Sequence, residues 1–325
     1  MADIPTLDDI RATREQLRPY IRTTPCLEIK PRELASDPSF DSTLVFKLEL
    51  FQLTGSFKAR GALAVMLNLT PEQRTLGVTA VSAGNHAIAV AYAASVLGLH
   101  ARVVMLKSAN PARVALARSY GAEIEFAEDG ASAFQRVQEI QNVEGRSFVH
   151  PFEGARTVLG TASLGAEFLE QTQQLDAVVI AVGGGGLLAG VAAAMKQAAP
   201  RLRVYGAEPM GADSLSRSFA AGKPVTLERV STIADSLAPP MATPYTFEVC
   251  RQFVDGLVLV DDEAMRRTMG IMFRDLKLAV EPAGAAALAA VLGPLRAQLS
   301  GGRRVGVVVC GSNIDLETFH RYASL

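Results

Sequence analysis

Residues 54–62 read Thr-Gly-Ser-Phe-Lys-Ala-Arg-Gly-Ala, and they place one lysine at the start of a predicted helix. Ser56 is suited to cap that helix, because the run from Ala59 to Leu69 is rich in Ala, Leu, Val and Met. A helix N-terminus carries partial positive charge, which lowers the pKa of a lysine placed there. Lys58 is therefore a candidate amine nucleophile of the kind that forms Schiff bases, although an ordinary surface lysine after a cap would look the same locally.

The composition indicates a folded protein with a large core. The chain has 325 residues, of which 49% are hydrophobic and 20% charged, enough for two domains or for one domain with an elaborated second lobe. Its net charge of -1 and the absence of a basic block argue against nucleic-acid binding. The three cysteines, Cys26, Cys250 and Cys310, have no metal-like spacing and fit a reducing compartment, so we expect a cytoplasmic protein.

No targeting or membrane segment is predicted. Residues 1–5 lack a basic stretch followed by an apolar one, so we expect no signal peptide. Residues 177–195 carry no charge, but four consecutive glycines divide them. We therefore expect a buried strand, a glycine turn and a helix there, not a membrane span.

The hydrophobic pattern predicts an α/β fold with two parallel-sheet lobes and helices on both faces, because strand and helix patterns alternate along the chain. Residues 210–250, rich in Pro, Ser and Met, give no clear assignment. The expected strands are 44–49, 78–81, 102–106, 123–126, 147–150, 177–182, 203–207, 256–260 and 305–309. The expected helices are 7–18, 59–69, one ending near 97, 111–120, 131–141, 160–173, 187–197, 264–277 and 283–292.

The glycine turn Gly183-Gly184-Gly185-Gly186 follows a predicted buried strand and opens a helix. Glycines at such a place let backbone N–H groups approach an anion, and the helix dipole favours negative charge. Two phosphate ligands are possible on this local pattern. Gly184-x-Gly186-x-x-Ala189, with Glu208 at the end of the next strand, also matches a dinucleotide site in which the carboxylate binds a ribose.

Five motifs in order decide between these alternatives. The lysine stretch, Ser82-Ala83-Gly84-Asn85-His86-Ala87, the glycine turn, Glu281-Pro282-Ala283-Gly284 and Cys310-Gly311-Ser312-Asn313 together resemble the fold type II pyridoxal-phosphate family. The resemblance is greatest to its threonine/serine dehydratase and serine racemase branch. It runs from the first helix to the C-terminus and implies a tryptophan synthase beta-like fold, with a large domain of residues 1–52 and 147–325 and a small domain of residues 53–146.

The resemblance also implies roles for single residues. Lys58 would form the Schiff base with the cofactor and then act as the base at Cα. The other residues expected to hold the cofactor are Phe57 beside its ring, Asn85 at its 3-hydroxyl, Gly183, Gly184, Gly185, Gly186 and Leu187 around its phosphate, and Cys310 opposite its pyridine nitrogen. The residues expected to receive the substrate carboxylate are Ser82, Ala83, Gly84, Asn85 and His86.

Departures from the family pattern indicate the reaction. A neutral thiol at Cys310 cannot fully protonate the ring nitrogen, which favours elimination over transamination. Serine racemases carry a serine where this chain has Ala83, so we expect dehydration in preference to racemisation. The divalent-cation site of several relatives would use Glu208, the Ala212 carbonyl and an acidic residue where this chain has Ser214, so a metal is possible but doubtful.

The sequence therefore predicts a pyridoxal-phosphate-dependent dehydratase that converts L-threonine or L-serine to a 2-oxo acid and ammonia. Within the same cofactor class, phenylserine or 3-hydroxyaspartate dehydratase and amino-acid racemase are the alternatives. A NAD(P)-dependent oxidoreductase and a catalytically silent binding protein are the alternatives outside it. The resemblance further implies a homodimer, and the few residues after Asn313 imply the short form without a regulatory domain.

Overall fold

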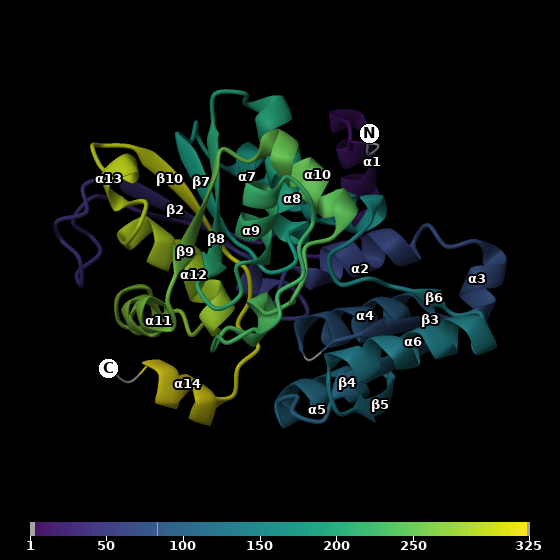
Figure 1. The fold of residues 1–325 in the computed structure, drawn as a ribbon. Helices are drawn as coiled ribbons and strands as arrows, with labels where there is room; N and C mark the ends of the chain where they lie inside the picture. The colour runs from purple at the N-terminus through teal and green to yellow at the C-terminus, as the bar shows by residue number, and fades with distance from the viewer. Residues whose placement is uncertain (1–3, 83, 324–325) are drawn as a thin grey trace.

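The chain folds around two β-sheets, as seen in a computed structural model that describes residues 4–82 and 84–323 (Figure 1). The larger sheet has the strand order β1-β2-β10-β7-β8-β9. Its neighbours pair in parallel, except that β1 runs antiparallel to β2 at one edge. The strands are β1 (Cys26–Ile29), β2 (Thr43–Leu48), β10 (Arg304–Val309), β7 (Ala177–Ala181), β8 (Arg203–Pro209) and β9 (Gly256–Val260).

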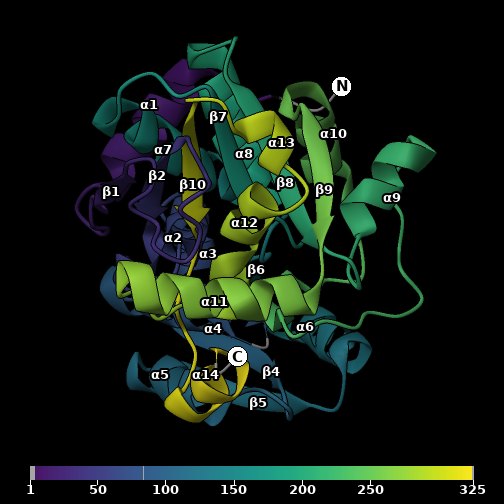
Figure 2. The same ribbon diagram turned by 90° about the vertical axis from the view of Figure 1, so that its left-hand side faces the viewer.

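Helices cover both faces of this larger sheet, which explains why β7 and β10 are continuous apolar runs. Helix α12 packs on one face, and α8 lies on the other face with α7 next to it (Figure 2). The helices of this lobe are α1 (Leu7–Leu17), α7 (Ala155–Gln171), α8 (Gly186–Ala198), α9 (Ser214–Ala221), α10 (Pro244–Phe253), α11 (Asp262–Leu276), α12 (Pro282–Leu292), α13 (Arg296–Leu299) and α14 (Leu316–Ala323), with the short 3-10 helices η1 (Glu49–Phe51) and η2 (Asp235–Leu237).

The smaller sheet is wholly parallel, in the order β5-β4-β3-β6. Successive residues of β4 point to opposite faces, so Val103 joins the core beneath α4 while Val104 joins the core beneath α6. Its strands and helices are α3 (Pro71–Leu76), β3 (Val78–Val81), α4 (Asn85–Leu97), β4 (Ala101–Leu106), α5 (Pro111–Ser119), β5 (Glu123–Ala127), α6 (Gly130–Glu144) and β6 (Ser147–Phe148).

The two parallel-sheet lobes expected from the sequence are thus confirmed, and helix α2 (Lys58–Met66) lies between them. Helix α2 packs against α7 of the larger lobe and α4 of the smaller one. The division into domains remains a prediction. Strand β6 pairs with β3, so residues 147 and 148 belong to the smaller sheet.

The predicted cap at Ser56 is wrong. Helix α2 begins at Lys58, its N-cap is Phe57 in a helical conformation, and no side chain caps it. The reason is tertiary, because Ser56 forms a β-bridge with Gly311 and the Phe57 N–H donates to the Cys310 carbonyl at 3.1 Å. This pairing fixes the entry to α2 against the end of β10, which places Lys58 next to Cys310.

The segment that gave no assignment, residues 210–250, contains α9, η2 and the first part of α10. Strand β1 and helices α3, α13 and α14 were also not expected from the sequence. Over residues 4–82 and 84–323, none of the helices combines the length and the apolar character that a membrane span requires. The charge-free stretch from residue 177 forms β7, a glycine turn and α8, as predicted.

Candidate active site

A cavity of about 430 Å³ opens between the two lobes, within the size range of small-molecule sites. Its wall combines segments that are far apart in the sequence. The residues expected at the site that line it are Phe57, Lys58, Ser82, Gly84, Asn85, His86, Gly183, Gly184, Gly185, Gly186, Leu187 and Cys310. Ala83 lies outside the described residues. The structure therefore brings the cofactor and substrate residues of the sequence analysis together around one space.

Lys58 lies at the narrow end of this cavity, at the first position of α2. Its Nζ donates a hydrogen bond to the Pro151 carbonyl at 2.5 Å and lies 5.1 Å from the centroid of the Phe57 ring. Burial lowers the pKa of Lys58 to about 8, against the opposing influence of Cys310 and Glu281. The direction agrees with the expectation from the sequence, and its largest cause is the removal of the amine from water.

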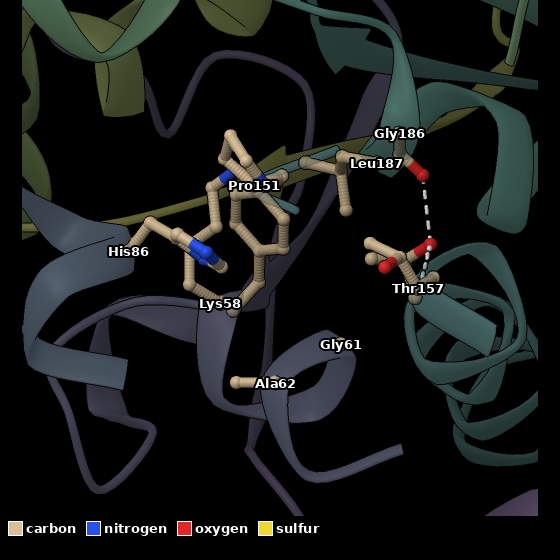
Figure 3. A pocket seen from close by; sticks show the side chains of 10 residues that line it. Lys58, Gly61, Ala62, His86, Pro151, Thr157, Gly186 and Leu187 are labelled. Atoms are coloured by element: carbon tan, nitrogen blue, oxygen red, sulfur yellow. Dashed lines mark hydrogen bonds between the residues drawn. The ribbon is translucent and has the colours of Figure 1, made fainter. Parts of the chain in front are cut away.

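Figure 3 shows the narrow end from close by, with Lys58 and His86 on one side and Thr157 and Leu187 on the other. Gly186 lies above Thr157 in this view, at the start of α8. The space next to Lys58 is thus enclosed by both lobes.

The glycine turn joins β7 to α8 and has the form of an anion cradle. Gly185 has φ +86°, a left-handed conformation that favours glycine. A Cβ on Gly184 would lie 2.3 Å from the Phe152 ring, and one on Gly186 would lie 2.5 Å from the Phe152 carbonyl oxygen. Only glycines therefore fit beneath Phe152. The start of α8 lines the cavity with these glycines, and a helix N-terminus of this kind suits a phosphate group.

Cys310 lies at the end of β10 and is buried in the cavity wall. Burial, with the nearby Glu281 carboxyl, raises the pKa of the Cys310 thiol far above its ordinary value. The thiol is consequently neutral at physiological pH. A neutral thiol is what the family resemblance implies opposite a pyridine nitrogen, and this role of Cys310 stays a prediction.

Glu281 and Arg113 are two charged residues of the site to which the sequence analysis assigned no role. Glu281 accepts from Asn85 Nδ2 at 2.6 Å and from Arg113 at 3.0 Å. Arg113, on α5, also donates to Asp235 at 2.5 Å and to the Asn313 carbonyl at 2.7 Å. Glu281 belongs to one of the five motifs found in the sequence, so that motif could have identified it as a site residue. Arg113 belongs to no motif and has the sequence surroundings of an ordinary arginine on a helix surface. Together they link the smaller lobe to the larger one across the cavity.

The loop between β3 and α4 presents a helix N-terminus to the cavity. The Gly84 N–H donates to Ser82 Oγ at 3.0 Å, and α4 begins at Asn85. His86 Nε2 lies 2.8 Å from the Val149 carbonyl, and burial lowers the pKa of His86 to about 3, so the ring is neutral. The backbone amides at the start of α4 are therefore the groups there that suit a carboxylate.

Glu208 and Ala212, the expected metal ligands, are not among the cavity-lining residues. The Glu208 carboxylate is buried and accepts the N–H groups of Leu215 and Ser216, both at 2.8 Å, so it caps α9. This also occupies the oxygens that a ribose would have bound. The part of the chain that the structure describes contains no group of three or more His, Cys, Asp or Glu placed to hold a metal ion.

Comparison with known proteins connects this cavity to one class of enzymes. The family profile described as "Pyridoxal-phosphate dependent enzyme" matches residues 17–311. Phenylserine dehydratase of Ralstonia pickettii is 52% identical over 99% of this chain and 97% of its own length. The structure of maize serine racemase has a TM-score of 0.91 at 35% identity, covering 98% of this chain and 96% of that one. The crystal structure of the T.th. threonine deaminase has a TM-score of 0.89 at 38% identity, covering 96% of this chain and 99% of that one.

Proposed function

Since the chain belongs to the pyridoxal-phosphate dependent enzymes of fold type II, in the branch of threonine/serine dehydratases and serine racemases, we propose that it dehydrates a β-hydroxy amino acid to a 2-oxo acid and ammonia. The cofactor is pyridoxal 5'-phosphate. The family match includes the Gly184–Ala189 turn, so the nicotinamide-dependent alternative is wrong. The observation that carries the proposal is a lysine of lowered pKa between a glycine anion cradle and a neutral thiol.

We propose that the residues around the cavity hold the cofactor as the sequence analysis expected. Lys58 would bind it covalently, and Gly183–Gly186 with Leu187 would bind its phosphate. Phe57, Asn85 and Cys310 would surround its ring. When bound, the cofactor supplies an electron sink for the charge left at Cα after deprotonation.

The protein's own groups would move the proton and orient the substrate. With its pKa near 8, the Lys58 amine is partly neutral at physiological pH and can take the proton from Cα. The Pro151 carbonyl holds Nζ in place by its hydrogen bond. The loop Ser82–His86 would receive the substrate carboxylate on its backbone N–H groups, which fixes Cα near Nζ.

The identity of the substrate remains open within this class. L-Threonine and L-serine are the expectation from the sequence, and phenylserine is supported by the 52% identity to phenylserine dehydratase. For 3-hydroxyaspartate, a cation would have to bind the second carboxylate, and Arg113 is already bound to two carboxylates. A racemase requires an acid on the second face of Cα, and Ala83 has no hydroxyl to act as one.

The proposal is tested by incubating the holoenzyme with L-threonine, L-serine, threo-phenylserine, 3-hydroxyaspartate and D-serine. We expect equal amounts of 2-oxo acid and ammonia from at least one β-hydroxy amino acid, and none with Lys58→Ala. Formation of the opposite enantiomer without ammonia would identify a racemase. The absence of any product from a fully loaded enzyme would contradict the proposal.

We also propose the cytoplasm as its location, a homodimer as its assembly, and two domains. The reduced state of Cys26, Cys250 and Cys310 supports the cytoplasm. The homodimer rests on the family resemblance and is tested by light scattering. The domains would be residues 1–52 with 147–325 and residues 53–146, adjusted so that β6 stays with the smaller sheet.

A further inference from the structure

Four aromatic side chains form a cluster beside the cavity, and the role of this cluster is not explained by cofactor binding. They are Phe134 of α6, Phe148 of β6, and His150 and Phe152 of the loop that follows. The ring centroids lie 4.6 Å apart for His150 and Phe152, 5.3 Å for Phe148 and His150, and 6.3 Å for Phe134 and His150. Phe134 and Phe152 line the cavity, whereas Phe148 and His150 lie behind them. We call these four residues the aromatic cluster.

His150 behaves as an uncharged aromatic ring within this cluster. Its Nδ1 accepts the N–H of Glu153 at 2.9 Å, which leaves the ring proton on Nε2. Burial lowers the pKa of His150 to about 4, so the imidazole is neutral at physiological pH. The cluster therefore presents an apolar, uncharged wall to the cavity.

The wall of the same cavity also contains apolar side chains that do not belong to the aromatic cluster. The segment from the end of η2 to the start of α10, in the larger lobe, contributes Leu237, Pro239 and Met241 to the cavity wall. On the smaller lobe, Gly130 lies one turn before Phe134 in α6, and a Cβ added there would meet no atom within 4 Å. The cavity is thus open beside Phe134.

The charged groups near this space do not suit an anionic side chain. Arg113 lines the cavity, but its guanidinium is bound to Asp235 and to the buried Glu281. A second carboxylate on the substrate would have to displace one of these ion pairs. A planar apolar ring, in contrast, would meet the Phe134 and Phe152 rings in edge or offset contact, the arrangement that aromatic pairs prefer.

We propose that the aromatic cluster is the subsite for an aryl group on Cβ of the substrate, with Phe134 and Phe152 in contact with that ring. The substrate class is then the β-aryl-β-hydroxy amino acids, of which phenylserine is the simplest. This inference rests on the proposed dehydratase function and narrows it. Phe148 and His150 act as positioning residues that hold the two contacting rings.

The test compares two substrates and two unreactive amino acids in the holoenzyme. The first readout is the ratio of kcat/KM for threo-phenylserine to that for L-threonine. We expect Phe134→Ala to lower this ratio about tenfold, since the loss of aromatic contacts acts on one substrate only. Gly130→Leu, which fills the space beside Phe134, should lower the ratio in the same direction. Phe126→Ala is the matched control, because Phe126 is an exposed phenylalanine of β5 in the same lobe.

The second readout is binding without turnover, followed by the change in the cofactor's absorption spectrum. L-Phenylalanine and L-2-aminobutyrate lack the β-hydroxyl that is eliminated and share the same amino and carboxylate groups, so the ratio of their dissociation constants reports the side-chain subsite. We expect wild type to bind L-phenylalanine more tightly than L-2-aminobutyrate, and Phe134→Ala and Gly130→Leu to reduce the difference. These binding measurements test the subsite even if no β-hydroxy amino acid yields a 2-oxo acid. That failure would contradict the proposed dehydratase function but not the proposed subsite.

The inference is overturned if wild type binds L-2-aminobutyrate as tightly as L-phenylalanine. It is equally overturned if Phe134→Ala and Gly130→Leu change the constants for both amino acids by the same factor. Should Phe134→Ala fail to fold, Phe134→Leu keeps the apolar volume and removes the ring, and Gly130→Leu leaves the cluster intact.

Discussion

Replacement of Arg60 by methionine should destabilise the protein strongly. The Arg60 side chain is fully buried and lies two residues after Lys58 in α2. It donates to both oxygens of Glu49 at 2.9 Å and to Glu167 at 3.0 Å. Burial alone would lower the pKa of Arg60, but these two carboxylates more than offset it, so the guanidinium stays charged.

The size of the effect follows from what the substitution leaves behind. Glu167 would keep its contact with the buried Lys47 at 2.5 Å. Among the residues that the structure describes, the Thr24 hydroxyl would be the one remaining hydrogen-bond donor to the Glu49 carboxylate. An uncompensated buried charge of this kind costs about 3–5 kcal/mol. That is a large part of the roughly 5–15 kcal/mol by which a domain is stable. We therefore expect a loss of this order in the free energy of unfolding.

The assay is urea unfolding of the cofactor-loaded protein, followed by circular dichroism. The double variant Arg60→Met/Glu49→Met removes both charges of the pair and should be more stable than Arg60→Met alone. Arg11→Met is the control, because Arg11 pairs with Asp8 on the exposed surface of α1. A loss of less than about 1 kcal/mol in Arg60→Met, or a double variant less stable than the single one, would show that no uncompensated charge is left buried at Glu49.

Three further predictions concern the cavity. The rate at which the apoprotein takes up pyridoxal phosphate should rise between pH 7 and 9, with a midpoint near 8. The reason is that only the neutral Lys58 amine reacts, and burial lowers its pKa to about 8. A rise only at the ordinary lysine pKa near 10.5 would contradict this prediction. Gly184→Ala should weaken cofactor binding roughly tenfold in a fluorescence titration. The new methyl group would lie 2.3 Å from the Phe152 ring, so the ring would have to move. An unchanged dissociation constant would show that the turn does not hold the phosphate. Cys310→Asp should raise the yield of transamination products relative to 2-oxo acid, with Cys26→Ser as control, and unchanged partitioning would count against the role given to the neutral thiol.

Much of this fold could be predicted because its signals are local. The apolar runs that form β7 and β10, and the glycines between β7 and α8, are readable from neighbouring residues alone. The edge strand β1 is short and is defined by its pairing with β2, so nothing local marks it. Helix α9 is stabilised by the Glu208 carboxylate at its N-terminus, and this contact cannot be predicted from the residues next to the helix.

The candidate site also combines residues that the sequence predicts with residues that it does not. Lys58 and the glycine turn lie in motifs that are recognisable in order, and the structure places them on one cavity. The contacts of Arg113 with Asp235 and Glu281 join residues more than one hundred positions apart, so only the folded chain reveals them. At Ser56, in contrast, the local sequence predicts a helix cap that does not form. The reason is that Ser56 pairs with Gly311, a residue far away in the sequence.

We propose that Lys58 carries the cofactor and performs the chemistry. The most direct measurement is borohydride reduction of the loaded protein, followed by peptide mapping by mass spectrometry. We expect one reduced pyridoxyl-phosphate group per chain, on the peptide that contains Lys58, and no label on the buried Lys47. A label on another lysine, or a loaded protein that borohydride leaves unmodified, would show that Lys58 does not bind the cofactor covalently.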